Sequence, residues 1–98
     1  MREFATEPPV EARVGDTLRE AGASVAVAES CTGGLVGSLL TDIPGSSAYF
    51  DRSVVTYSYD AKLAALGVSR ESLDDHGAVS EPVAGEMAAG VRDTAGVD

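Results

Sequence analysis

The sequence has one cysteine, one histidine and no tryptophan among its 98 residues. A single cysteine cannot form an internal disulfide, and without a cluster of cysteines no structural zinc site is expected. The longest apolar run is far shorter than the roughly 18 residues that a membrane span needs, and the first residues lack the apolar stretch of a signal peptide. We therefore expect a cytoplasmic protein with no membrane segment and no metal.

Basic residues are also scarce. Seven lysine and arginine side chains stand against sixteen aspartates and glutamates, which gives a net charge of -9. This charge has the wrong sign for neutralising phosphates, so nucleic acid is not an expected partner. Hydrophobic residues make up 44% and charged residues 23% of the chain. That mixture is typical of one folded domain rather than of a disordered segment.

Apolar spacing and turn residues predict an alternation of helices and strands. Residues 1–9 contain Pro8 and Pro9 and are expected to be a flexible lead-in. The expected elements are a helix at 10–21, a strand at 24–28, a helix from 35, a strand at 49–58, and helices from 60, 69 and 80. The first strand is short, small and β-branched, which is typical of a parallel strand covered on both faces. The sequence therefore predicts an α/β fold in the order αβαβααα.

The first and last helices have the clearest patterns. Val10, Val14, Leu18 and Ala21 form one apolar stripe, and Gly22 stands where a helix C-cap glycine is expected. Near the end of the chain, a serine at position 80 can cap a helix that has proline in its permitted first turn. The buried side of that helix is expected to carry three apolar residues spaced by four: Val83, Met87 and Val91.

Ser30 stands between the first predicted strand and the glycine-bearing start of the next helix. There the backbone N–H groups of Cys31–Gly34 would point outward unpaired and could hold an oxyanion beside a serine nucleophile. Alternatively, Ser30 or Thr32 is only a helix N-cap. Cys31 is the rival nucleophile, because a helix start activates a thiol, and its other interpretation is a small core residue.

Lys62 is the only lysine in the chain, and a lysine can lose a proton where an arginine cannot. With Asp60 as N-cap, Lys62 falls in the first turn of a helix and its side chain leans back toward the preceding strand end. Tyr57, at that strand end, could reach the same pocket and relay a proton. A solvated lysine and a core tyrosine are the alternatives. His76, at a predicted helix end, is interpreted as a solvated charge rather than as a base.

Two stretches of the chain together resemble the CinA C-terminal domain family. They are AESCTGGLVGSLLTDIPGSSAYFDRSVVTYSYDAK and HGAVSEPVAGEMAAGV, and the resemblance runs from about Val10 to the end. It implies a three-layer α/β/α sandwich, of which residues 10–98 would be the N-terminal portion. It also implies that nicotinamide mononucleotide is hydrolysed to nicotinic acid mononucleotide and ammonia without a cofactor. Ser30 would be the nucleophile, with Lys62 and Tyr57 as its helpers.

The resemblance implies a substrate site as well. Cys31, Thr32, Gly33 and Gly34 would border it, and Arg52 or a helix N-terminus would hold the substrate phosphate. In the family the domain continues with a further strand and a glycine-rich loop, so this chain is expected to be an incomplete domain. We therefore expect a homo-oligomer and a poor deamidase when the chain is alone. The alternative is a catalytically inactive remnant that serves as a binding or assembly module.

Overall fold

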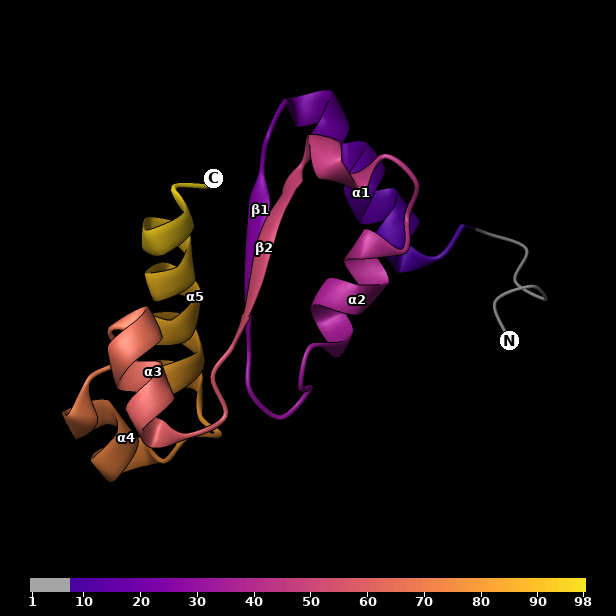
Figure 1. Ribbon diagram of the computed structural model, residues 1–98. Coiled ribbons are helices and arrows are strands. Elements are labelled where there is room, and N and C mark those ends of the chain that lie inside the picture. Colours follow the sequence, from indigo (N-terminus) through magenta and orange to yellow (C-terminus); the bar gives the residue numbers. More distant parts are fainter. Residues whose placement is uncertain (1–7) are drawn as a thin grey trace.

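The computed structural model describes residues 8–98 as a parallel two-stranded sheet with helices on both faces (Figure 1). The elements are α1 (Val10–Ala21), β1 (Val25–Glu29), α2 (Leu35–Thr41), the 3-10 helix η2 (Ser46–Ala48), β2 (Phe50–Val55), α3 (Tyr59–Leu66), α4 (Arg70–His76) and α5 (Glu81–Ala95). The predicted αβαβααα order is confirmed, and η2 is an addition. Of the expected lead-in at 1–9, all but Pro8 and Pro9 lies outside the described residues.

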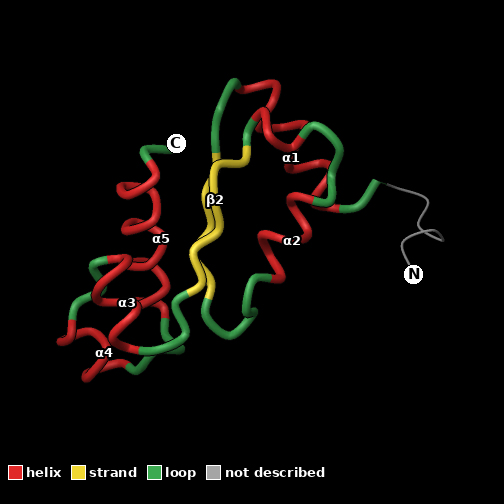
Figure 2. The backbone as a smooth tube through the Cα atoms, in the orientation of Figure 1, coloured by secondary structure: helices red, strands yellow, loops and turns green. Residues whose placement is uncertain are grey.

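The two strands form the middle layer of the structure. Val25 is opposite Phe50 and Glu29 is opposite Val55, with a register shift directly after Val25. Figures 1 and 2 show α1 and α2 on one face of the sheet and α3, α4 and α5 on the other. The three-layer arrangement is therefore confirmed for this partial domain. Because the strands are parallel, both of their carboxyl ends lie at the same edge of the sheet.

The main apolar core lies between the sheet and the layer of α3, α4 and α5. Its buried members are Leu66, Val68, Leu73, Val83, Met87 and Val91. The three apolar residues predicted for the buried side of α5 are all among them. Small or β-branched side chains of the strands, at Ala26, Ala28 and Val54, pack against this cluster. A short aliphatic core of this kind holds α5 directly over β1.

The start of α3 differs from the prediction. Ser58, not Asp60, is the N-cap, and its side chain accepts a hydrogen bond from the backbone N–H of Ala61 at 3.0 Å. Ser58 has the extended backbone that an N-cap needs, whereas Asp60 already lies in the helix. The preceding strand ends at Val55, three residues earlier than predicted. Lys62 therefore lies a full turn inside α3.

Helix α1 has the predicted bounds and ends at Gly22 with a φ of 64°, but its apolar stripe does not face the core. Val10 is 60% exposed and Val14 is 38% exposed. The buried side instead carries Gly15, where an added Cβ would lie 2.3 Å from the hydroxyl oxygen of Tyr49. The close approach of α1 to this buried ring decides which side of the helix faces inward.

We expect Gly90→Ala to destabilise the fold. Helices α3 and α5 approach so closely that a Cβ on Gly90 would lie 1.9 Å from the carbonyl oxygen of Leu66. Backbone cannot rotate away as a side chain can, so the variant should lose about 1 to 3 kcal/mol of unfolding free energy. Gly85→Ala, in the same helix but with open space around the added Cβ, should instead gain about 0.5 to 1 kcal/mol. Urea unfolding followed by circular dichroism measures both, and equal stabilities would contradict the proposed packing.

Candidate active site

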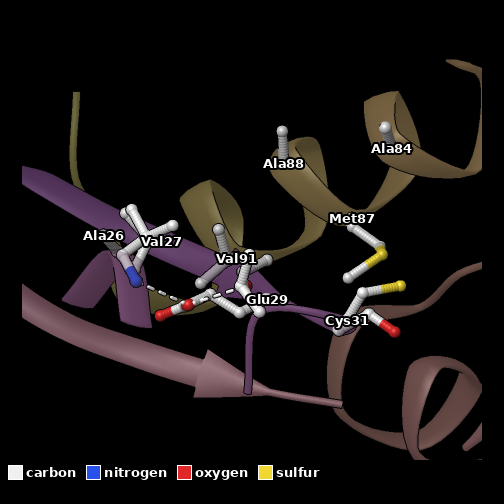
Figure 3. Close-up of a pocket in the computed structure, with 12 residues that line it drawn as sticks. Ala26, Val27, Glu29, Cys31, Ala84, Met87, Ala88 and Val91 are labelled. Carbon is white, nitrogen blue, oxygen red and sulfur yellow. Dashed lines mark hydrogen bonds between the residues drawn. The ribbon is translucent and has the colours of Figure 1, made fainter. Parts of the chain in front are cut away.

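The candidate site lies where the two parallel strands end. Ser30 directly follows β1, and Thr56 directly follows β2 with its N–H bonded to the carbonyl of Glu29 at 2.8 Å. An open cleft of about 500 Å³ borders Ser30, Cys31 and Thr32 on one side and α5 on the other. Figure 3 shows Met87 and Val91 of α5 pointing toward β1 across this cleft. A ligand can therefore reach Ser30 from solvent.

Lys62 reaches this strand end from α3 and is fully buried. Its Nζ lies 2.9 Å from Ser30 Oγ, 2.7 Å from the carbonyl oxygen of Thr56 and 3.1 Å from that of Tyr57. Within residues 8–98, no carboxylate forms an ion pair with this amine. The predicted meeting of Ser30 and Lys62 is thus present in the structure, and the alternative of a solvated lysine is wrong.

The amine of Lys62 donates hydrogen bonds to all three of these neighbours. A carbonyl oxygen can only accept a hydrogen bond, whereas a serine hydroxyl can accept one and also donate its own hydrogen. The carbonyls of Thr56 and Tyr57 hold the amine from one side, and its third hydrogen bond goes to Ser30 Oγ. This arrangement places the amine in direct contact with the Ser30 hydroxyl.

Glu29 is the residue that the sequence analysis missed. Its side chain is 3% exposed, and its two carboxylate oxygens accept five hydrogen bonds. The donors are Thr32 Oγ1 at 2.8 Å, the backbone N–H groups of Gly34, Val36 and Gly37 at 3.2, 2.9 and 2.9 Å, and Ser53 Oγ at 2.6 Å. The signal in the sequence that could have identified it is an acidic residue at the end of an otherwise apolar strand, just before a glycine turn.

The hydrogen bonds to Glu29 determine its protonation. Burial by itself would raise the pKa of this carboxyl, but the donors from Ser53, Gly37, Val36 and Thr32 outweigh it and lower the pKa from 4.5 to about 2. Hydrogen bonds that favour the ionised form have this effect on carboxylates. Glu29 is therefore an anion at neutral pH, and its oxygens are occupied in holding the turn and the start of α2.

The prediction that the backbone N–H groups of residues 31–34 are all unpaired is wrong for Gly33 and Gly34. Gly33 donates its N–H to the carbonyl of Ser30 at 3.0 Å, and Gly34 donates to Glu29. The first hydrogen bond closes the turn, and the second goes to the buried carboxylate. In the part of the chain that the structure describes, the N–H groups of Cys31 and Thr32 have no hydrogen-bond partner. These two remain available for an oxyanion beside Ser30.

The other predicted site residues lie farther from the Ser30–Lys62 pair. The Tyr57 side chain is 75% exposed, so the core alternative is wrong and only its carbonyl contacts Lys62. Arg52 contacts its neighbour Asp51. It is opposite Ala26 in the sheet, roughly 13 Å along the strand from Ser30 at about 3.3 Å per residue. The structure therefore does not bring Arg52 to the pair.

The remaining observations concern Cys31, His76, metal ligands and membrane-crossing helices. Cys31 is exposed and borders the cleft, so the interpretation as a buried core thiol is wrong. His76 is exposed and is the last residue of α4, so its predicted solvated position at a helix end is confirmed. Over residues 8–98, the structure has no group of three acidic, histidine or cysteine side chains that could hold a metal ion. No helix in that range combines the length and apolar character that a membrane crossing requires.

Comparisons with known proteins agree with this architecture. The family described as CinA C-terminal domain matches residues 7–98. A CinA-like protein of Chloroherpeton thalassium is 56% identical over 93 residues, which are 95% of this chain and 22% of that protein. The nicotinamide-nucleotide amidohydrolase PncC of Escherichia coli is 55% identical over 86 residues, which are 88% of this chain and 52% of PncC.

Solved structures show the same fold. A CinA superfamily protein from Enterobacter cloacae has a TM-score of 0.89 and 34% identity, covering all of this chain and 61% of that one. A competence/damage inducible protein from Agrobacterium tumefaciens has a TM-score of 0.87 and 41% identity, covering 96% of this chain and 59% of that one. The chain thus spans between about a fifth and three fifths of the proteins to which it is similar.

We expect Glu29 to make stability depend on pH below about pH 4.5. Its pKa is lower in the folded chain, about 2, than its ordinary value of 4.5. The stabilisation is therefore complete above about pH 4.5 and is lost as the pH falls toward about 2. Urea unfolding of the wild-type chain and of Glu29→Gln should show a gap in stability that narrows between about pH 6 and about pH 3. A gap that stays constant over this range would contradict the assignment.

Proposed function

Because the chain belongs to the CinA C-terminal domain family, we propose that it hydrolyses the carboxamide of nicotinamide mononucleotide, with Ser30 as the nucleophile. The observation that carries this proposal is the distance of 2.9 Å between Ser30 Oγ and the Nζ of the buried Lys62. The similarity to a relative named nicotinamide-nucleotide amidohydrolase supports the choice of substrate. Since the chain spans 52% of that relative, the activity of the whole protein is part of the proposal.

The proposed reaction is an acyl transfer in two halves. Lys62 takes the hydroxyl proton of Ser30 while Oγ forms a bond to the carboxamide carbon, and the N–H groups of Cys31 and Thr32 hold the oxyanion. Lys62 then gives the proton to the leaving nitrogen, the C–N bond breaks and ammonia departs. Water hydrolyses the acyl-enzyme and restores Ser30. One oxyanion donor is worth roughly 3 to 4 kcal/mol of the barrier.

The remaining roles in this proposal concern Tyr57, Arg52 and the oligomeric state. The carbonyl of Tyr57 accepts a hydrogen from Lys62, and the predicted proton relay through its phenol stays a prediction. Phosphate binding by Arg52 also stays a prediction. The nucleophile and base both come from the chain, so the proposed chemistry draws on no cofactor. The homo-oligomer and the cytoplasmic location both stay predictions. Sedimentation would test the oligomeric state.

Ser30→Ala should abolish ammonia release from nicotinamide mononucleotide, whereas Cys31→Ala should keep most of it. The reason is that Ser30, and not the exposed thiol, contacts the buried amine. Ammonia release is measured with the 98-residue chain and with the chain joined to the part of Escherichia coli PncC outside the match, with PncC itself as the positive control. Loss of activity in Cys31→Ala alone would overturn the assignment. No release from either wild-type form would favour the non-catalytic binding or assembly module.

Lys62→Arg and Lys62→Met should each lower the turnover by about 100-fold to 10,000-fold, the range for a general base. Arginine carries a positive charge but cannot give up a proton under these conditions, and methionine keeps the length without the amine. Circular dichroism establishes that each variant is folded, and ammonia release gives the rate. A folded Lys62→Arg variant with wild-type turnover would show that Lys62 supplies charge rather than a proton acceptor.

A further inference from the structure

We propose that Glu29 is the positioning residue of this site: its buried carboxylate fixes the turn that carries Ser30 at hydrogen-bond distance from Lys62. The inference rests on the proposed role of Ser30 as the nucleophile. It concerns a residue that touches neither reacting atom. Within the described residues, Glu29 has no hydrogen bond to Ser30 Oγ or to Lys62 Nζ, so its effect must act through the backbone and the neighbouring donors.

The Glu29 carboxylate holds both ends of the turn that carries Ser30. Glu29 is joined to Ser30 by the peptide bond, and its Oε1 accepts hydrogen bonds from Thr32 Oγ1 and from the N–H of Gly34. The carbonyl of Ser30 accepts the N–H of Gly33 inside the same loop. The segment from 30 to 34 is therefore closed over one anion. Rotation of the turn would require these bonds to break together.

The same carboxylate relates this turn to the strand that positions Lys62. Oε2 of Glu29 accepts a hydrogen bond from Ser53 Oγ at 2.6 Å, and Ser53 belongs to β2. Three residues further along, the carbonyl of Thr56 accepts the Lys62 amine at 2.7 Å. Glu29 thus connects the element that presents the hydroxyl to the strand end that holds the amine. A shift of about 1 Å in such a pair can cost about 100-fold in rate.

Glu29→Gln tests this role, because glutamine keeps the size but replaces one accepting oxygen with a donating NH₂ group. The probe is a fluorophosphonate, which reports the reactivity of Ser30 without the natural substrate. Ser30 Oγ forms a bond to phosphorus, the P–F bond breaks, fluoride leaves and the proton passes to Lys62. We expect Glu29→Gln to label roughly 10 to 100 times more slowly than the wild-type chain, and Ser30→Ala not to label.

Glu86→Gln is the matched control. Glu86 is also a carboxylate that serves a helix start, because it accepts the N–H of Ser69 at 2.8 Å, but it lies outside the contacts of Ser30 and Lys62. It should label at the wild-type rate even if thermal unfolding shows a loss of stability. Equal slowing in both glutamine variants would mean that stability alone governs labelling and would overturn the inference. Wild-type labelling in a folded Glu29→Gln would overturn it as well.

Ser53→Ala keeps the inference testable if Glu29→Gln does not fold. It removes one donor from the carboxylate and should slow labelling several-fold; an unchanged rate would overturn the inference. In the ammonia assay, Glu29→Gln should lower kcat by a larger factor than it raises KM, because the distance between Ser30 and Lys62 acts on the chemical step. If Ser30 labels and depends on Glu29 but nicotinamide mononucleotide is not hydrolysed, the proposed substrate fails and the positioning role stands. If wild-type Ser30 does not label, both fail.

Discussion

The buried carboxylate of Glu29 is the constraint on which the site end of the sheet depends. An anion with 3% exposure is costly unless donors replace the water that it has lost. The first N–H groups of a helix are in turn costly when buried without acceptors. The Glu29 carboxylate accepts hydrogen bonds from the first N–H groups of α2, and it accepts another from Ser53 of β2. One interaction therefore fixes a strand end, a helix start and the turn between them.

This interaction requires a close approach that only small residues permit. A Cβ on Gly37 would lie 2.7 Å from the Cβ of Ser53 and 3.3 Å from Oε2 of Glu29, so α2 could not rest on β2 at this distance with a larger residue. Gly33 and Gly34 have φ values of 61° and 108°, which residues with a side chain rarely adopt. The glycines of the turn act on the site through the path of the backbone.

Local sequence patterns were sufficient for most of the fold. The order of elements, the Gly22 cap, the Ser80 cap and the buried side of α5 all depend on residues within a few positions of one another. The errors fall where distant segments meet. The hydrogen bonds of Glu29 reach as far as Ser53, and the inward side of α1 is set by Tyr49. Neither contact has a signature in the spacing of one segment.

The Ser30–Lys62 pair shows the same division between local and distant causes. Each residue could be singled out from its neighbourhood, one by the glycine turn and the other by being the only lysine. Their distance, however, is set by the parallel pairing that places Glu29 opposite Val55 and by the carbonyls that follow β2. Those carbonyls face inward because the strand ends three residues before Ser58 caps α3. The short linker after β2 thus leaves the carbonyl oxygens of Thr56 and Tyr57 without sheet partners. They accept hydrogen bonds from the Lys62 amine, which also contacts Ser30.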